Sequence, residues 1–434
     1  MNNQLQKNKF NQKIAKLLQA SFALILLIST PILYLSPVRA QESRSHRRSC
    51  WASRVGVAEC NAHVLIDASA GQPLTTSVYA NGYNPTDLAS AYNLPALPIA
   101  GSNFNWNGKV VVIVDAFDNP NVSSDLLAYR KQFNLPLCST TNPAPTTNDL
   151  IGCLFSKVNQ SGLSSPTPVA NIGWGQEIDL DVDMVAATCP NCKILLIEAS
   201  SNYFSDLGAA VDRAALMGAN SISNSYGGSE FSGENTVSYN GHFNHPGVAI
   251  TVSAGDSGYG TSFPAASQYV TAVGGTSLTK SASTRGWNET VWPGTGSGCS
   301  RYIPRLNWQP RIGTCSNRVI ADVSAVADPY TGVAVYDSFG SATSNNWYVF
   351  GGTSVAAPVI ASVYAESGNA GGLTPGITYG EYPYTHTTNL NDVVTGSNGR
   401  CSYRFSISNK ALCTAEIGFD GPSGLGTPKG LLAF

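Results

Sequence analysis

Ser354 stands where a short apolar strand pattern, Tyr348 to Phe350, passes through Gly351 and Gly352 into an Ala/Val-rich segment. The two glycines allow a sharp turn, and the alanines after them favour a helix. A serine at such a helix start would lie beside free backbone amides and the positive end of the helix dipole, which stabilise an oxyanion. Ser354 is therefore a candidate nucleophile, although Gly-Thr-Ser on its own is also common in ordinary loops.

A serine nucleophile needs a base, and the acidic segment from Gln176 to Ala187 offers carboxylates for that role. Its pattern predicts a helix on which Glu177 and Asp181, four residues apart, share one face beside an apolar stripe. Two like charges at the edge of a buried face raise at least one pKa, which makes a carboxylate usable as a base or an acid. Spacing alone predicts equally well a solvated acidic helix face that includes Asp179 and Asp183.

Asp256 is a third candidate carboxylate. It follows a strand pattern, Val248 to Ser253, in a turn between Gly255 and Gly258, so it can point into the same strand-end cleft as Ser354. In its protonated form it could donate a hydrogen bond to a developing oxyanion. An aspartate that caps its own turn is the alternative.

The elements that must position these residues alternate between apolar strands and helical patterns from about residue 84 to residue 370. Such an alternation predicts an α/β fold whose mostly parallel sheet is covered on both faces and binds ligands at the carboxyl ends of its strands. The predicted strands span residues 109–114, 194–198, 221–225, 248–253, 269–273 and 333–336. The predicted helices span residues 123–133, 176–188, 204–217 and 354–365, and a short strand is expected at 63–67.

The N-terminal residues predict export. Residues 1–40 carry lysines, then an apolar run from Leu17 to Leu35, then a small-residue site at Val38-Arg39-Ala40, which is the pattern of a secretory signal. An uncleaved membrane anchor is the alternative for so long a run; after cleavage no stable membrane association is expected. The net charge of −2 with 12% charged residues provides no basic footprint for nucleic acid, so no nucleic-acid partner is expected. From the signal pattern we expect a secreted, extracellular protein, and we expect it to be a monomer.

Ten cysteines in an exported chain predict disulfides, and they fall in sequence as five close couples. A Cys-x-x-Cys couple can also be a redox pair, but an activated pair needs a helix N-terminus and this one follows a helical pattern. We therefore expect five local structural bridges: Cys50/Cys60, Cys138/Cys153, Cys189/Cys192, Cys299/Cys315 and Cys401/Cys413.

Five ordered motifs resemble the sedolisins, the family of serine-carboxyl peptidases. The motifs are Glu177-x-x-Leu180-Asp181, Ser225-Tyr226-Gly227-Gly228-Ser229-Glu230, Ser253 to Gly258, Phe263-Pro264-Ala265 with Val270 to Thr276, and Gly352-Thr353-Ser354 with Pro358. The resemblance runs from about Tyr83 to the C-terminus. It implies a subtilisin-like three-layer α/β fold and endopeptidase or tripeptidyl-peptidase activity on peptide or protein substrates.

The resemblance also implies roles for individual residues. Ser354 matches the nucleophile, Glu177 the general base, Asp181 the acid that orients Glu177, and Asp256 the acid of the oxyanion hole. A wall against which the substrate backbone pairs is implied for Ser225, Tyr226 and Gly227.

One calcium ion is implied in the same way. Residues Asp392 to Gly399 and Ile417 to Asp420, within a loop at 390–426, resemble the family's calcium loop. Calcium prefers carboxylate and backbone carbonyl oxygens, and the implied ligands are Asp392, Val393, Glu416, Gly418 and Asp420. Without the resemblance, Asp/Gly-rich loops of this kind predict only turns.

Residues 41–83 are expected to form a short lead segment ahead of a peptidase domain at 84–434. This segment is much shorter than the large pro-domain typical of sedolisins, so either folding needs no such segment or the short one, with Cys50 and Cys60, serves instead. The resulting prediction is a secreted, acid-active serine-carboxyl peptidase. A subtilisin-type enzyme using Asp115 and a histidine is disfavoured by the absence of a His-Gly-Thr helix start, and the alternative from another class is a non-catalytic secreted binding protein.

Overall fold

The computed structural model describes residues 44–51, 54–68, 71–73, 82–97, 108–140, 153–341, 345–369, 379–401 and 407–434. Residues 44–434 form one compact unit. The predicted signal segment lies outside the described residues. Within the described ranges, no helix combines the length and the apolar character needed to cross a membrane.

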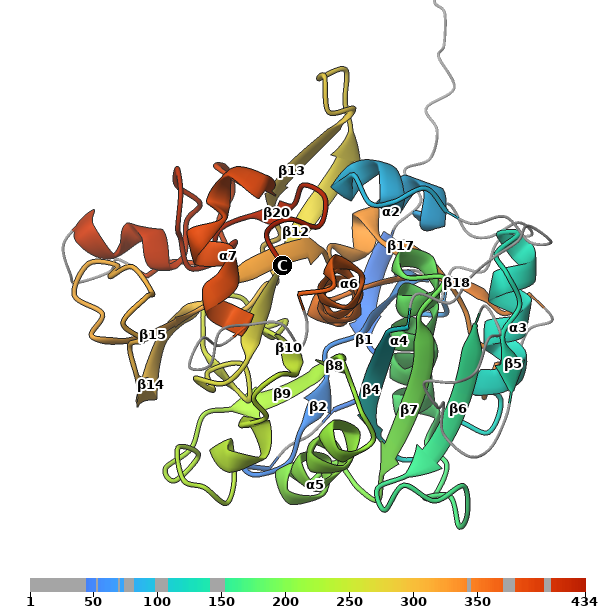
Figure 1. Ribbon diagram of the computed structural model, residues 1–434. Helices are drawn as coiled ribbons and strands as arrows, with labels where there is room; N and C mark the ends of the chain where they lie inside the picture. Colours follow the sequence, from blue (N-terminus) through green and yellow to red (C-terminus); the bar gives the residue numbers. More distant parts are fainter. Residues whose placement is uncertain are drawn as a thin grey trace, which may run out of the picture. The chain divides into compact units, whose positions relative to one another are not determined.

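A nine-stranded sheet forms the centre of this unit (Figure 1). Its strands lie in the order β13-β12-β10-β8-β4-β7-β6-β5, with β16 also paired to β12, and every pair is parallel except β12 with β13. The predicted α/β fold with a mostly parallel sheet is therefore confirmed. The strand bounds are β4 Val110–Ala116, β5 Ser139–Thr140, β6 Leu154–Asn159, β7 Lys193–Ala199, β8 Ser221–Asn224, β10 Ala249–Ser253, β12 Thr271–Lys280, β13 Trp287–Val291 and β16 Val323–Val326.

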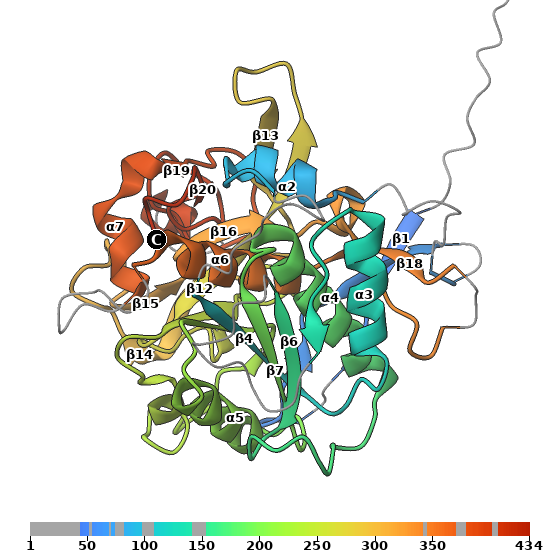
Figure 2. The same cartoon turned by 45° about the vertical axis from the view of Figure 1, so that its right-hand side comes forward.

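Helices cover both faces of the sheet, because alternate residues of each strand point to opposite sides. On β4, Val111 and Ile113 pack into the core formed with α3, α4 and α6, whereas Val112 and Val114 pack into the core formed with α5. Helices α3 and α4 lie side by side in both views (Figure 1, Figure 2). The helices are α2 Pro85–Tyr92, α3 Val122–Gln132, α4 Ile172–Thr188, α5 Phe204–Leu216, α6 Thr353–Ser367 and α7 Tyr382–Thr385, with short 3-10 turns η1 Asn240–Phe243, η2 Pro329–Thr331, η3 Tyr379–Glu381, η4 Thr387–Asn389 and η5 Ile407–Leu412.

One strand assignment was wrong. The strand at Val333–Tyr336, β17, does not join the parallel sheet but pairs antiparallel with β18 (Trp347–Gly351). Together with β1 (Arg44–Arg48) and β3 (His63–Asp67) these strands form a separate four-stranded sheet. The apolar pattern identifies a strand but not its partner, and consecutive strands joined by a short connection pair most readily with each other.

The lead segment is folded against the rest of the unit. Strand β3 pairs with β18, and β2 (Glu59–Cys60) pairs with β9 (Tyr226–Ser229). The remaining strands are β11 Ser262–Phe263, which pairs with β9, the pair β14 Gly298–Pro304 with β15 Asn317–Ile320, and the pair β19 Leu390–Asn391 with β20 Thr427–Pro428. All five predicted disulfides are present.

Candidate active site

Ser354 is the second residue of α6 and is completely buried. The turn before it depends on Gly352, whose φ of 98° is in the region that only glycine adopts freely. A Cβ at that glycine would lie 1.9 Å from the carbonyl oxygen of Asn61 and 2.5 Å from Asp256 Oδ2. The backbone at the start of α6 therefore lies very close to Asn61 and Asp256, which leaves room only for glycine. The strand before the helix, β18, belongs to the four-stranded antiparallel sheet and not to the central sheet.

Glu177 and Asp181 lie on α4 and are fully buried, so the alternative of a solvated acidic face is wrong. Burial raises the pKa of both carboxyls, and for Glu177 the neighbouring carboxylates Asp181 and Asp115 raise it further. Their oxygens accept no well-formed hydrogen bond from a described residue. The side chains of Ser354 and Ser225 are near enough to offset part of the rise, Ser354 for the pKa of Glu177 and Ser225 for that of Asp181.

Asp115 and Glu198 extend this acidic group at the carboxyl ends of two neighbouring strands. Asp115 on β4 stands directly opposite Glu198 on β7 in the parallel register. Burial is the main cause that raises the pKa of Asp115, and Asp181 and Glu198 add to it. The sequence analysis considered Asp115 only for the disfavoured subtilisin-type alternative, and it missed Glu198, whose position at the end of the next strand was the available signal.

Asp256 lies in the turn after β10, next to the start of α6. Its Oδ1 accepts hydrogen bonds from the Thr353 amide at 2.9 Å and the Thr353 hydroxyl at 2.6 Å, while Oδ2 has no hydrogen-bond partner among the described residues. Burial raises the pKa of Asp256 to about 7, against the opposing influence of Arg48 and of the Thr353 bonds. Asp256 therefore holds the N-terminus of the helix that carries Ser354 and keeps one oxygen available.

The predicted substrate wall lies beside Ser354. Ser225 follows the end of β8, and its carbonyl accepts a hydrogen bond from the Ser354 hydroxyl at 3.1 Å. Tyr226 is buried, with its hydroxyl donating to Asn224 Oδ1 at 2.8 Å, and Gly227 continues β9. The wall thus places backbone groups next to the candidate nucleophile.

Sequence reasoning missed the lead-segment residues that also reach this site. The Ser354 amide donates to the carbonyl of Asn61 at 3.2 Å, and His63 Nε2 lies 3.4 Å from Asp256 Oδ2. Arg48 donates to Ser257 Oγ at 3.2 Å. Nothing in their local spacing marks these residues, because β-pairing between distant segments brings them here.

Residues 167–375 match the model of the Subtilase family. Kumamolisin of Bacillus sp. (strain MN-32) is 29% identical over 82% of this chain and 63% of its own length, and sedolisin of Pseudomonas sp. (strain 101) is 30% identical over 42% and 33%. The chain is thus similar to members of the sedolisin family, in agreement with the resemblance of its motifs.

The similarity to sedolisins extends over only part of the length of the relatives, but the folds superpose over most of this chain. The chain matches less than two thirds of the length of each of these relatives; for tripeptidyl-peptidase 1 of Bos taurus, 30% identical, the matched share is 36%. A solved structure of Pseudomonas sedolisin, a serine-carboxyl proteinase complexed with two molecules of pseudo-iodotyrostatin, superposes with a TM-score of 0.61. It is 24% identical and covers 80% of this chain and 95% of that one.

The residues expected to bind calcium lie together near the C-terminus. Asp392 Oδ2 accepts from the Gly418 amide at 2.8 Å, and Asp420 Oδ2 accepts from the Glu416 amide at 3.0 Å. The Ser423 hydroxyl lies 2.8 Å from Asp420 Oδ1 and 3.3 Å from the carbonyl of Val393. Burial raises the pKa of Asp420 to about 7, and Asp392 contributes to the rise. Two carboxylates that repel each other beside a backbone carbonyl form a donor set suited to a hard cation.

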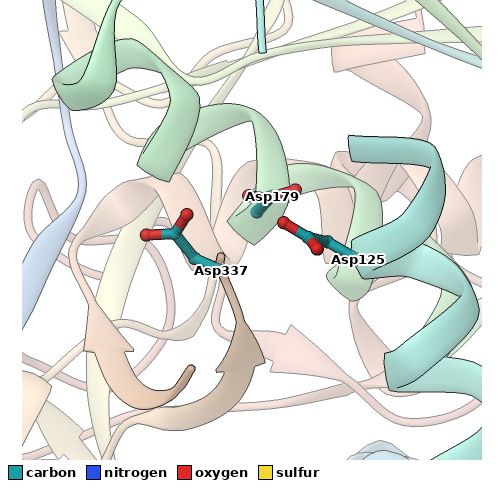
Figure 3. Close-up of side chains that lie close together, drawn as sticks. All are labelled: Asp125, Asp179 and Asp337. Atoms are coloured by element: carbon teal, nitrogen blue, oxygen red, sulfur yellow. The ribbon is translucent and has the colours of Figure 1, made fainter. Parts of the chain in front are cut away.

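A second acidic cluster lies elsewhere in the unit. Asp125 of α3, Asp179 of α4 and Asp337 after β17 place carboxylate oxygens within 4.8 Å of one another (Figure 3). Each already accepts a hydrogen bond: Asp179 from Asn119 Nδ2 at 2.7 Å, Asp125 from the Ser338 amide at 2.9 Å and Asp337 from the Phe339 amide at 3.0 Å. The first bond joins α4 to the segment before α3, the second joins α3 to the loop after β17, and the third lies within that loop, so the cluster has a structural role.

Proposed function

We propose that this chain is a secreted, sedolisin-type serine peptidase that hydrolyses peptide bonds with Ser354, Glu177 and Asp181. One observation carries the proposal: a fully buried acid pair without well-formed hydrogen bonds lies beside the serine at the start of α6. Among the described residues, the Ser354 hydroxyl has no hydrogen bond to a histidine. A carboxylate with a raised pKa is the available base.

In the first step Ser354 Oγ attacks the carbonyl carbon of the scissile bond while Glu177 accepts its proton. Asp181 positions Glu177 and shares protons with it, so the pair titrates as a unit. In the neutral form that its raised pKa favours, Asp256 donates through Oδ2 to the oxyanion, together with the Ser354 amide. Water then hydrolyses the acyl ester and restores the serine.

The substrate backbone pairs along Ser225, Tyr226 and Gly227, which follow the carboxyl end of β8. Oxygen donors at Asp392, Val393, Glu416, Gly418 and Asp420 would hold one calcium ion, which stabilises the C-terminal loops. Five disulfides, together with the signal-like residues 1–40, favour an extracellular location.

The test is hydrolysis of a mixed peptide library by the full chain and by Ser354→Ala. The variant should lose activity by at least about a thousandfold, because the nucleophile is removed, while its melting temperature stays close to that of the wild type. A wild-type chain that is folded and cleaves nothing at any pH from 3 to 9 would instead favour a binding protein on this scaffold.

A further inference from the structure

Two histidines and an aspartate that have no role in the proposed catalysis form a cluster. His242 Nδ1 lies 2.7 Å from Asp212 Oδ2, and His245 Nε2 lies 2.9 Å from Asp212 Oδ1. Asp212 belongs to α5, whereas both histidines belong to the segment between β9 and β10 that contains η1. The cluster therefore joins two elements whose residues are 30 and 33 positions apart in the sequence.

Packing holds the histidine segment against α5. Phe243, between the two histidines, is only 3% exposed and lies in the same core cluster as Leu207 and Val211 of α5. The ring of His242 lies over Gly208, one helical turn before Asp212, where a Cβ would be 2.5 Å from His242 Cδ2. A glycine at this position thus leaves the space that the ring occupies beside the carboxylate.

The hydrogen bonds of this cluster are made among its own members. Among the residues that the structure describes, the side chains of Asp212, His242 and His245 form no other hydrogen bond or ion pair. The cluster of three aspartates differs, because its oxygens accept hydrogen bonds from an asparagine side chain and from backbone amides. A metal ion that replaced the contacts of the histidine cluster would leave no outside donor without its partner.

The donor atoms suit a transition-metal ion. Imidazole nitrogens and a carboxylate oxygen are ligands that zinc takes in proteins. Ligand atoms on one tetrahedral zinc lie about 3.3 Å apart, because the bonds to zinc are about 2.0–2.2 Å long, and the two nitrogen–oxygen contacts are already close to that separation. The rings contact opposite oxygens of Asp212, so an ion would draw the two nitrogens toward each other. The side chains of His242, His245 and Asp212 are 24%, 23% and 40% exposed, which allows this rotation and lets an ion enter from solvent.

We propose that Asp212, His242 and His245 bind one Zn²⁺ ion, with water as the fourth ligand. The proton on each contacting ring nitrogen moves to the other nitrogen of the same ring, so the neutral imidazoles stay neutral and Asp212 stays a carboxylate. The ion ties α5 to the segment that leads into β10. This site differs in its nitrogen donors from the proposed calcium loop, and it does not depend on the proposed peptidase function.

The experiment titrates the full chain, carrying no histidine tag, with Zn²⁺ at pH 7.5 in the presence of excess calcium. Calcium occupies sites built from oxygen atoms, so the heat of zinc binding reports sites that contain nitrogen. Isothermal titration calorimetry should find one Zn²⁺ per chain. Zinc should also raise the melting temperature, because the three ligands meet only in the folded state.

Matched variants assign the ligands. His245→Gln and Asp212→Asn each remove a good zinc ligand but keep a side chain that can form a hydrogen bond. Each should raise the Kd for Zn²⁺ at least about tenfold, since even the loss of a partner outside the ligand set weakens metal binding by about 10- to 100-fold. His386→Gln is the control, because the His386 ring stacks on Tyr382 with centroids 4.0 Å apart and forms no ion pair with a described carboxylate. It should leave the Kd within about twofold of the wild type.

Other outcomes overturn the site. A wild type that binds no Zn²⁺ more tightly than about 100 μM contradicts it. Equal affinities in the wild type, His245→Gln and Asp212→Asn place the bound zinc elsewhere, for example at His46 and His63, whose Nδ1 atoms lie 2.8 Å apart, and contradict it too. Melting curves without zinc show whether each variant is folded, and His242→Gln replaces any variant that is not. Peptide hydrolysis is measured separately, so each of these results leaves the proposed peptidase function standing.

Discussion

Helix α4 carries two pairs of buried carboxyls with the same four-residue spacing, and the two pairs differ in their partners. Asp179 and Asp183 accept hydrogen bonds, from Asn119 Nδ2 at 2.7 Å and from the Tyr336 amide at 2.9 Å. Glu177 and Asp181 have no well-formed bond among the described residues; Glu177 lies next to Ser354, and Asp181 lies next to Ser225. All four have raised pKa values, with burial as the main cause.

This difference shows that a raised pKa alone does not identify a reactive carboxyl. Buried polar groups are normally hydrogen-bonded, so one without a partner indicates a group held ready for another role. Asp179 and Asp183 connect α4 to its neighbours. Glu177 and Asp181 make no such connection, and their burial beside the proposed nucleophile costs free energy that no hydrogen bond offsets.

The largest expected effect separates the two pairs directly. Glu177→Gln removes the base and should lower kcat for peptide hydrolysis by a factor of about 100 to 10,000. Asp179→Asn is the matched control, because it keeps the shape and a hydrogen-bonding group but lies in the structural pair. It should retain kcat within about twofold and change mainly the melting temperature. Similar losses of kcat in both variants would contradict the division of α4 into two pairs.

The next effect concerns Asp256, which combines features of both pairs, since one oxygen is bonded and the other is not. Asp256→Ala should lower kcat by a factor of about 100 to 1,000 with a smaller change in KM, as for the loss of one oxyanion donor. Asp256→Asn keeps a donor and should retain more activity, with the decline above about pH 7 removed because the group that titrates there is gone. Near-wild-type kcat in a folded Asp256→Ala protein would reduce Asp256 to a cap for the turn.

A moderate effect is expected on stability as pH rises from 6.5 to 8. The folded pKa values of Asp256, about 7, and Glu198, about 8, are above the ordinary values of 3.8 and 4.5, so the folded state binds more protons in this window and loses stability as pH rises. The pKa of His63 is lowered to about 3, which has the opposite effect only below its ordinary value of 6.5. The melting temperature should fall across the window, and less steeply in Asp256→Asn. A flat or rising curve would contradict the raised values.

The smallest effect concerns a third acidic region, the loop with Asp392 and Asp420. If the loop binds calcium only in the folded state, calcium at a hundredfold excess over Kd should raise the free energy of unfolding by about 3 kcal/mol. The melting temperature should therefore rise with excess calcium and fall after chelation. Asp420→Asn should abolish the response, whereas Asp337→Asn in the hydrogen-bonded cluster should not. Identical melting curves with calcium and with chelator would contradict calcium binding by this loop.

Several features could be predicted from local sequence. The spacing of apolar residues located α3, α4, α5 and α6 within a few residues of their observed ends, because each buries a face of regular period. Pairs of cysteines close in sequence predicted the five disulfides, since short loops bring them together. The four-residue spacing of Glu177 and Asp181 placed both on one helix face, whatever surrounds it.

Only the tertiary structure decided which strands pair and which carboxyls have partners. The assignment of Val333–Tyr336 to the parallel sheet was wrong because hydrogen bonds between strands are not visible in the pattern of either strand. The difference between Asp179 and Glu177 depends on Asn119 and Ser354, which are far away in sequence. For the same reason nothing near Asn61 indicates its position at Ser354: that position follows from the pairing of β2 with β9, a contact between residues more than a hundred positions apart.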